Sequence, residues 1–540
     1  MFWTEKTDKA KRSRSLRAAS ARFAKEEDGS LTIFSLYIFI IMVSLGGLAM
    51  DVMHFDTVQT KLQNTADRAS LAAADLDQSL NGYAVVNDYF DKAEMSKYLK
   101  ATDVRGGINW REVEIHTEAV IPTYFMFWTS DAHQLTAKAD SIASEKVTDI
   151  EISLVIDISG SMGSNNRLPR LKVAAGEFFD AVIKNTTDPN LGITSVSIIP
   201  YNHSVNVGPD ILAHYNPTTK HNESYCIRFT SNNMKWRGQS TTNSLNRIAH
   251  FTQNDQGISS STDMYRVPDS WEFWCRNDSR TEIMPFQFDK QKLKDHVNAF
   301  YASGWTGIDN GMKWASILLD PSSRPVITNL KNAGKVPTLL AGRPVGYDNS
   351  ENMKVIVLMT DGANTLQRDL KSKYKNNKSD VWYSPSRDEW MVKIKANTSS
   401  KRWYYPYDAD TGSDDVYRSY KRSDAIRYTY QDLYKIWGVD DFSDYFYRRS
   451  NTALYEEHND VVETYIENGD IDDNVKLICN AVKAKNTSIF AIGFEAPTRG
   501  QDIMRECASS DGHYFDVDGT EITTAFKAIA SQINRLRLTQ

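Results

Sequence analysis

The residues best suited to chemistry lie in the segment IDISGSMG, from Ile156 to Gly163. Asp157 supplies a carboxylate there, and Ser159 and Ser161 supply hydroxyl groups at alternate positions. Oxygen donors of this kind suit a hard divalent cation, and a near-octahedral arrangement favours Mg²⁺. One carboxylate and two hydroxyls do not complete a coordination shell, so a cation site here requires oxygens from distant parts of the chain.

Two distant segments offer the missing oxygens. Thr306 lies in the glycine-flanked loop of GWTGIDNGMKWA, just before a predicted helix, and Asp361 lies in LMTDGANT, directly after the apolar run MKVIVLM. The predicted ligand set is therefore Asp157, Ser159, Ser161, Thr306 and Asp361. The expected cation is Mg²⁺, with Mn²⁺ or Ca²⁺ as alternatives.

A catalytic serine is the rival interpretation of the same segment, and a simple turn after a buried strand is the third. A nucleophile elbow has the pattern G-x-S-x-G, but serine occupies position 159, where the first glycine of an elbow around Ser161 belongs. No histidine stands in an obvious general-base context, although folding could bring His203, His296 or His513 near. The sequence contains no P-loop and no H-E-x-x-H motif. These patterns favour binding, and no catalytic residue is expected.

The elements that position these side chains alternate between strand and helix from Asp149 onward. Apolar runs such as ISLVIDI, SVSIIPYN, MKVIVLMTD and SIFAIGF are typical of buried strands, whereas RLKVAAGEFFDAVI, LKDHVNAFYAS, VKLICNAVKAKN and EITTAFKAIASQINRLRL have a helical period. The alternation predicts an α/β fold with a mostly parallel sheet wrapped by helices. Ligands of such sheets bind at the carboxyl ends of strands, where IDISGSMG and LMTDGANT begin.

Two stretches interrupt the alternation and are interpreted as insertions. Residues 203–285 are polar and rich in Asn and Ser, while residues 366–470 contain 14 of the 26 tyrosines. Interleaved Tyr, Arg, Lys and Asp can form a contact surface for a protein partner. Alternatively, the aromatic rings form the insertion's own core. A net charge of −6 and a pI near 6.0 argue against nucleic-acid binding.

A chain of 540 residues is too long for one compact core, and its N-terminal part is organised differently. The segment from Leu31 to Met50 contains no charged residue. As a helix it extends about 30 Å, enough to cross the hydrocarbon core of a bilayer. A buried core helix and a cleaved signal peptide are the alternatives, but the segment exceeds a usual signal h-region and no A-x-A site follows it. We expect an uncleaved membrane anchor.

The charges that flank this span predict its orientation. Asp51 and Asp56 precede Lys61, the first lysine after the span. The basic residues before the span are Lys6, Lys9, Lys11, Arg12, Arg14, Arg17, Arg22 and Lys25. Because the positive side of a span stays in the cytoplasm, we expect the N-terminus there and the bulk of the chain in the bacterial periplasm.

All four cysteines lie on that oxidising side, which favours disulfides over free thiols. Proximity in sequence suggests the pairs Cys226–Cys275 and Cys479–Cys507, although four cysteines allow three connectivities. No C-x-x-C spacing occurs, which argues against a zinc ribbon and against a thioredoxin-like site.

Between the span and the α/β region the sequence changes from a helical to a β pattern. Residues 112–144 are β-rich, because EVEIHTEAV and QLTAKADSIAS alternate and YFMFW is an apolar run. Before them, apolar positions recur at mostly helical steps: Phe55, Leu62, Ala66, Ala69, Ala73, Leu76 and Leu80. A long helix followed by a small antiparallel sheet is therefore expected over residues 51–145.

The five oxygen donors together resemble the metal-ion-dependent adhesion site (MIDAS) of von Willebrand factor A (vWA) domains. That site combines D-x-S-x-S, a threonine in a loop and an aspartate after a central strand, and DISGSM, GWTGIDNG and TDG match it in order. The resemblance covers about residues 149–540, with the two insertions as departures. It implies that the serines bind the cation directly, that the aspartates act directly or through water, and that Thr306 joins or leaves the shell. A cation with few anionic ligands stays electrophilic and seeks a partner's carboxylate.

The N-terminal part resembles TadG-type proteins, which serve the assembly of Tad (Flp) type IV pili. The shared features are a basic lead, Gly29 and Ser30 before the span, Asp51 after it, and the helical segment 67–74. The closing segments ECASSDGHYFDV and AFKAIASQINRLRL are also similar to that family. A prepilin carries glutamate at the fifth position after its cleaved glycine, but here that position is Phe34. An uncleaved protein that spans the inner membrane once is therefore expected.

The expected organisation is a cytoplasmic basic lead at 1–28, a transmembrane helix at 29–50, a pilin-like, TadE/TadG-like helix and small β region at 51–148, and a vWA domain at 149–540. The expected function is that of a membrane-anchored, non-enzymatic pilus assembly factor whose metal site binds an acidic residue of minor pilins or other Tad components. A surface adhesin that binds host or matrix ligands through the same metal is the main alternative. A chelatase-like subunit is a third, but it requires an ATPase partner, and the periplasm offers no ATP.

Overall fold

The computed structural model describes residues 28–75, 78, 80–106, 110–126, 133–146, 149–183, 192–218, 223–253, 273–349, 352–394 and 401–539. The chain divides into two compact units, Met1–Lys146 and Val147–Gln540. Apart from Asp28, the basic lead predicted at residues 1–28 lies outside the described residues.

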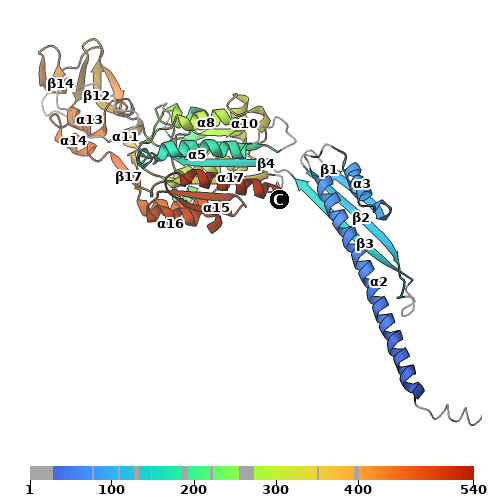
Figure 1. Ribbon diagram of the computed structural model, residues 1–540. Coiled ribbons are helices and arrows are strands. Elements are labelled where there is room, and N and C mark those ends of the chain that lie inside the picture. The colour runs from blue at the N-terminus through green and yellow to red at the C-terminus, as the bar shows by residue number, and fades with distance from the viewer. Residues whose placement is uncertain are drawn as a thin grey trace, which may run out of the picture. The chain divides into compact units, whose positions relative to one another are not determined.

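The first unit is built on one long helix, α2 (Asp28–Ala74) (Figure 1). Most large apolar side chains of α2 between Leu31 and Met53 are exposed, whereas from Leu62 onward its apolar side chains that face the sheet are buried. The helix is long and apolar enough to cross a membrane. The predicted span and the predicted amphipathic stripe are thus consecutive parts of a single helix.

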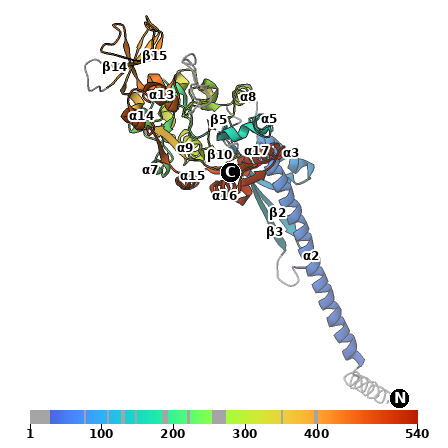
Figure 2. The ribbon, with the colours of Figure 1, turned by 90° about the vertical axis from the view of Figure 1, so that its left-hand side faces the viewer.

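A three-stranded antiparallel sheet covers the C-terminal half of α2, with the order β1 (Leu99–Gly106), β2 (Trp110–Pro122), β3 (Gln134–Lys146) (Figure 2). Alanines on the helix let the backbones approach closely, so the helix and the sheet share one core. Helix α3 (Gly82–Lys92) adds Phe90 to it. The buried residues of this core include Leu62, Ala66, Ala69, Ala73, Val113, Ile115 and Ala137.

Two expectations for this unit were wrong. The run YFMFW was predicted as β structure, but Tyr124 and Phe125 form the bend that ends β2, and Met126 lies in a turn. Phe127 and Trp128 lie outside the described residues. The apolar stripe was extended to Leu80, but α2 ends at Ala74 and Leu80 is exposed in a bend, while Leu76 lies outside the described residues. Hydrophobicity alone does not distinguish the turn at Tyr124–Met126 from a strand, or Leu80 from a helical residue.

The second unit contains a six-stranded sheet with the order β19-β18-β10-β4-β5-β9. Five neighbouring strands are parallel, and β9 is antiparallel to β5. In chain order the strands are β4 (Asp149–Asp157), β5 (Thr194–Tyr201), β9 (Met284–Gln287), β10 (Asn352–Thr360), β18 (Ser488–Phe494) and β19 (Tyr514–Val517). The predicted mostly parallel sheet is therefore present.

Helices cover both faces of this sheet (Figure 1). In β4 the side chains of Leu154 and Ile156 join one core and that of Val155 joins the other, as the alternation of a strand requires. One face packs against α5 (Arg167–Val182), α8 (Lys290–Asn298) and α17 (Glu521–Thr539). The other packs against α9 (Ile308–Leu319), α10 (Arg324–Asn332), α15 (Asn468–Lys483) and α16 (Thr498–Cys507).

The two interruptions predicted from the sequence pack together. Ala249, Phe251 and Trp274 from the first share a buried aromatic core with the residues of the second. The first also contains α6 (Gly208–Leu212), α7 (Ser231–Met234) and a sheet of β6 (Asn216–Pro217), β8 (Ser244–Arg247) and β7 (Ile227–Arg228). We call the described residues of 203–285 and 366–470, taken together, the insertion body.

The tyrosine-rich segment leaves and rejoins the α/β unit through one antiparallel pair, β11 (Gln367–Leu370) and β17 (Val462–Ile466). Between them it forms a five-stranded sheet with the order β15-β14-β13-β12-β16, and its elements gather at one end of the unit (Figure 1). These elements are α11 (Lys373–Asn376), β12 (Lys378–Ser384), β13 (Glu389–Lys393), β14 (Trp403–Asp408), β15 (Ser413–Arg418), β16 (Ile426–Thr429), α12 (Tyr430–Tyr434), α13 (Val439–Phe446) and α14 (Thr452–His458).

Many tyrosines of the insertion body are interior residues. Tyr404, Tyr405, Tyr434 and Tyr447 are almost completely buried, whereas Tyr420 is exposed. Of the two interpretations that the sequence left open, an aromatic core therefore describes these four residues. Buried rings of this kind stabilise the insertion body and are not available to a partner.

Both disulfides suggested by sequence proximity are present. Cys226 is bonded to Cys275 within the insertion body, and Cys479 of α15 is bonded to Cys507 of α16. The second bond holds together two helices that cover the same face of the sheet.

Candidate metal centre

The strand order brings two of the predicted ligands together at the carboxyl edge of the sheet. β4 and β10 are parallel neighbours, with Ile156 opposite Met359. Asp157 is the last residue of β4, and Asp361 directly follows β10. Thr360 joins them, because its hydroxyl donates to Asp157 Oδ2 at 2.7 Å.

The loop after β4 is fixed by its own hydrogen bonds. Asp157 Oδ1 accepts a hydrogen bond of 2.8 Å from the backbone N–H of Ser159. The N–H of Gly160 donates to the carbonyl of Gly304 at 2.8 Å, which ties this loop to the loop that carries Thr306. A Cβ atom at Gly160 would lie 3.2 Å from that carbonyl oxygen, so the approach favours glycine.

Three side-chain oxygens then form a chain of two hydrogen-bond contacts, with Ser161 in the middle. Ser159 Oγ is 3.1 Å from Ser161 Oγ, and Ser161 Oγ donates to Asp361 Oδ1 at 2.7 Å. Ser159 and Asp361 are buried, with 1% and 2% of their surface exposed, while Ser161 is exposed. The exposed hydroxyl of Ser161 thus marks where the cluster meets solvent.

Thr306 faces the same space from the loop before α9. A Cβ atom at Gly362 would lie 3.2 Å from Thr306 Oγ1 and 3.9 Å from Ser161 Oγ, so glycine leaves this space open. Thr306 is held by Thr365: its N–H donates to Thr365 Oγ1 at 3.0 Å, and its carbonyl accepts from the N–H of Thr365 at 3.0 Å. All five predicted ligands therefore lie at one edge of the sheet.

The two carboxylates lie in an environment that disfavours their negative charge. The pKa of Asp157 is raised to about 7, first by burial and then by the negative charge of Asp361. Burial also raises the pKa of Asp361, while Ser161 and Arg167 act in the opposite direction. Arg167 Nη1 lies 2.9 Å from Asp361 Oδ2, and its Nε lies 2.8 Å from Glu495 Oε2.

The donor set fits a small hard cation. An octahedron with metal–oxygen distances of about 2.1 Å has neighbouring oxygens about 3.0 Å apart. The distances of 3.1 Å between Ser159 and Ser161 and 2.7 Å between Ser161 and Asp361 are close to that value. Two buried acids and the space beside Gly362 supply the charge and room that such an ion needs. Within the described ranges no three His, Cys, Asp or Glu side chains cluster, so soft-metal ligation is not indicated there.

The structure gives the three histidines other partners. His203 Nε2 contacts the carbonyl of Trp274, and its Nδ1 accepts from the N–H of Trp305 at 3.3 Å. Burial lowers the pKa of His203 to about 3. His296 Nε2 bonds to the carbonyl of Glu282 at 2.9 Å, and His513 Nδ1 lies 2.7 Å from Ser510 Oγ. The serine-nucleophile interpretation therefore gains no support from these histidines.

Four residues of this region were not predicted from the sequence: Thr360, Arg167, Trp305 and Arg368. Thr360 holds Asp157, Arg167 binds Asp361, and Trp305 lies beside Thr306 with 42% of its surface exposed. The Trp305 ring is 5.4 Å from the Trp274 ring, and the Arg368 guanidinium is 5.5 Å from the Trp305 ring. Thr360 and Trp305 are sequence neighbours of predicted ligands, which was the available signal, whereas Arg167 and Arg368 depend on long-range packing.

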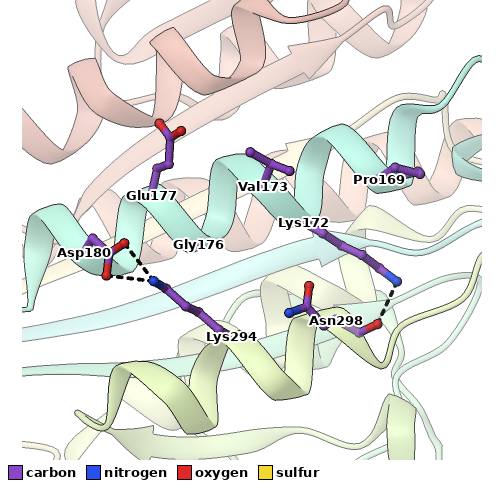
Figure 3. Close-up of a pocket in the computed structure, with 8 residues that line it drawn as sticks. All are labelled: Pro169, Lys172, Val173, Gly176, Glu177, Asp180, Lys294 and Asn298. Atoms are coloured by element: carbon purple, nitrogen blue, oxygen red, sulfur yellow. Dashed lines mark hydrogen bonds and ion pairs between the residues drawn. The ribbon is translucent and has the colours of Figure 1, made fainter.

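A hollow of 460 Å³ between α5 and α8 has a different character (Figure 3). Lys294 Nζ lies 2.7 Å from Asp180 Oδ2, and Lys172 Nζ donates to the carbonyls of Asn298 and Phe300 at 2.8 and 2.7 Å. Its lysines are thus already paired across the two helices. The hollow lies at the contact between α5 and α8, and its lysines stabilise that contact.

Comparison with known protein families gives a match in the N-terminal segment. Residues 29–76 match the family model described as putative Flp pilus-assembly TadE/G-like. The match covers the apolar part of α2 and its continuation along the sheet. A search of curated proteins found no match.

Solved structures similar to the chain include pilus tip proteins. The vWF domain of the type V pili tip protein Mfa5 from Porphyromonas gingivalis has 13% identity and a TM-score of 0.31, over 72% of this chain and 96% of that one. The adhesive tip pilin GBS104 from Group B Streptococcus agalactiae has 13% identity and a TM-score of 0.30, over 72% and 100%. The pilus adhesin SpaC from Lactobacillus rhamnosus GG has 12% identity and a TM-score of 0.27, over 82% and 34%. TM-scores of this size do not define a fold in detail.

Proposed function

We propose that the chain is a membrane-anchored, non-enzymatic assembly factor of a Tad (Flp) type IV pilus, whose vWA-type metal site binds an acidic side chain of a partner protein. The convergence of Asp157, Ser159, Ser161, Thr306 and Asp361 at one sheet edge carries this proposal. The TadE/G-like segment on a helix of membrane-spanning length supports the pilus assignment.

The roles of the site residues follow from their contacts. Mg²⁺, or Mn²⁺ or Ca²⁺ in its place, would supply an electrophilic centre for a carboxylate. The hydroxyls of Ser159, Ser161 and Thr306 would hold it directly. The two oxygens of Asp157 accept hydrogen bonds from Ser159 and Thr360, so this side chain orients the loop and would act on the cation directly or through bound water. Asp361, which Arg167 partly neutralises, leaves the cation available for a partner's carboxylate.

The proposed location is the bacterial inner membrane, with one span, a cytoplasmic N-terminus and the second unit in the periplasm. The positive residues before the span support this orientation. The two disulfides are consistent with an oxidising compartment. Minor pilins or other Tad components are the proposed partners, because they share that compartment with the metal site.

A deletion strain examined for pili by electron microscopy tests the assembly role. Pili are expected to be lost, to return with the wild-type gene and with Ser164→Ala, and to stay absent with Ser161→Ala. Ser164 is a matched control because it is an exposed serine three residues away from Ser161 and is not one of the predicted ligands. Normal pili in the deletion strain would overturn the assembly role and favour the adhesin alternative.

Trp305 is expected to contribute to partner binding without contributing to metal binding. It is exposed beside Thr306 and is supported by Trp274 and Arg368, the arrangement of an interface hot spot. We expect Trp305→Ala to weaken binding of the pilus partner about 10-fold or more and to leave Mg²⁺ affinity unchanged. Trp236→Ala is the control, because Trp236 is 67% exposed in a segment after α7, outside the site loops. Equal partner binding by both variants, measured by biolayer interferometry, would refute this contribution.

A further inference from the structure

The turn at Tyr124–Met126, which follows β2, is bound to α2 by the buried carboxylate of Asp51. Asp51 Oδ1 accepts a hydrogen bond of 3.0 Å from the N–H of Tyr124. Asp51 Oδ2 accepts from the N–H groups of Phe125 and Met126 at 2.8 and 2.7 Å. Asp51 is only 4% exposed and directly follows the uncharged segment Leu31–Met50. The turn is therefore fixed at the end of the apolar part of the helix.

A glycine one helical turn before Asp51 makes room for the aromatic ring of this turn. A Cβ atom at Gly47 would lie 2.6 Å from Phe125 Cβ and would also overlap the ring, so only glycine permits this contact. A Cβ atom at the neighbouring Gly46 would meet nothing within 4 Å apart from its own stretch of helix. The two adjacent glycines thus differ sharply: one receives Phe125 and the other faces open space.

If α2 is the proposed membrane anchor, the turn lies at the height where the exposed apolar surface of the helix ends. Large apolar residues of α2 are exposed up to Met53, and the next exposed one is Leu71. At about 1.5 Å per residue, Leu31–Met53 spans about 33 Å, close to the thickness of a hydrocarbon core. Gly47 and Asp51 then lie about 9 Å and 3 Å inside that boundary.

The exposed side chain of the turn suits this depth. Tyr124 is 64% exposed, although the two residues that follow it, Phe125 and Met126, are apolar. Tyrosine is enriched where a membrane meets water, because its ring prefers the acyl region and its hydroxyl prefers the headgroups. The Asp51 carboxylate is satisfied by three N–H groups, so its position near the boundary does not leave an unpaired charge.

We propose that the turn at Tyr124–Met126 enters the outer interface of the bilayer, with Tyr124 among the lipid headgroups and Phe125 packed on α2 beneath them. The occupant of this surface is lipid. The inference rests on the proposed membrane anchor and concerns a second contact with the same membrane. A helix alone leaves the first unit free to tilt about the span, whereas a helix and a turn together hold its sheet at a defined angle to the bilayer.

Depth-dependent fluorescence quenching tests this proposal on the full chain in phosphatidylethanolamine–phosphatidylglycerol vesicles. All four native cysteines are in disulfides, so Tyr124→Cys can be labelled selectively with a nitrobenzoxadiazole dye. Lipids with a headgroup nitroxide are expected to quench this label about twofold or more. Tyr83→Cys is the matched control: Tyr83 is 45% exposed in α3, near the far end of α2, and its label should remain unquenched.

A third label separates failure of this inference from failure of the anchor. Phe39 lies in the middle of the proposed span and is 59% exposed. A dye label on Phe39→Cys should therefore be quenched by lipids that carry a nitroxide deep in the acyl chain. Quenching at position 39 without quenching at position 124 overturns the turn contact alone. No quenching at position 39 overturns the anchor and this inference together.

The two glycines supply a matched pair of variants. Gly47→Leu is expected to displace Phe125 and abolish headgroup quenching of the label at position 124, whereas Gly46→Leu should leave it unchanged. Both substitutions add the same apolar side chain to the span, so a general change in hydrophobicity affects them equally. Identical quenching in the two variants would show that the Gly47 contact does not place the turn.

Discussion

Replacing Ser161 with alanine is expected to weaken Mg²⁺ binding about 100-fold or more, whereas Ser164→Ala leaves it unchanged. The Ser161 hydroxyl is the central oxygen of the cluster, 3.1 Å from Ser159 Oγ and 2.7 Å from Asp361 Oδ1. Loss of an outer partner of a metal ligand typically costs about 10- to 100-fold in affinity. Loss of a direct ligand from a site with only two carboxylates should cost at least as much.

Isothermal titration calorimetry of the detergent-solubilised chain measures this affinity. Thermal unfolding provides an independent readout, because a ligand at 100 times its dissociation constant stabilises the folded state by about 2.7 kcal/mol. Mg²⁺ should therefore raise the melting temperature of the wild type and of Ser164→Ala, and EDTA should reverse the effect. Wild-type affinity in Ser161→Ala would show that the oxygen cluster is not a cation site.

The same variant separates the metal from the surrounding surface. Ser161→Ala and EDTA should both abolish partner binding, because each removes the electrophilic centre. Trp305→Ala should reduce partner binding while the Mg²⁺-dependent rise in melting temperature persists. A partner that binds Ser161→Ala normally would bind through the surface alone.

The placement of the predicted ligands could be read from local patterns. Apolar runs with strand character ended directly before Asp157 and Asp361, and parallel strands in such folds place their carboxyl ends at one edge. Thr306 was found in the same way, in a glycine-flanked loop before a helix. Each of these signals spans fewer than about 12 residues, which is the length of one element and its turn.

Contacts between distant segments were beyond such patterns. Arg167 lies in the first turn of α5, where nothing in the sequence indicates that it binds Asp361 and Glu495. The insertion body presents the same difficulty: composition showed the abundance of tyrosine but not that Tyr404 or Tyr434 would be interior. Burial depends on which segments meet, and here two interruptions far apart in sequence share one core.

The turn at Tyr124–Met126 was misassigned for a related reason. An apolar aromatic run has strand character, and only its partners Gly47 and Asp51, more than 70 residues earlier, show that it is a turn held on a helix. The sequence indicates Asp51 only as a charge after the span and as a feature that resembles the TadG-type family. Its three hydrogen bonds give it a structural role that the sequence did not indicate.

A buried ion pair joins the two strands that lead to the acidic ligands, and breaking it is expected to be strongly destabilising. Glu151 of β4 lies directly opposite Lys354 of β10, and their charged groups are in contact. Both side chains are almost fully buried, and burial lowers the pKa of Lys354. A shift of this register by one residue would reverse the faces of one strand and move Asp157 away from Thr360.

Glu151→Leu is expected to destabilise the folded chain by about 3–5 kcal/mol, because it leaves the Lys354 ammonium buried without its counter-charge. The double variant Glu151→Leu/Lys354→Met should lose only about 1–3 kcal/mol. Its residual cost arises because the N–H of Val345, which donates to Glu151 at 2.8 Å, and the carbonyl of Leu319, which accepts from Lys354 at 2.9 Å, lose their partners. Urea unfolding monitored by near-ultraviolet circular dichroism measures both values.

An exposed ion pair supplies the control for this comparison. Asp460, 79% exposed at the side chain, pairs with Lys371 at 2.5 Å, and Asp460→Asn should change stability by less than about 1 kcal/mol. If the double variant were as unstable as Glu151→Leu, the unpaired lysine would not be the source of the loss. If instead the double variant recovers stability but binds Mg²⁺ more weakly, the main effect of the ion pair is to fix the register of β4 and β10, and its contribution to the free energy of unfolding is small. That outcome would connect a charge pair at one end of β4 and β10 to the spacing of Asp157 and Asp361 at the other.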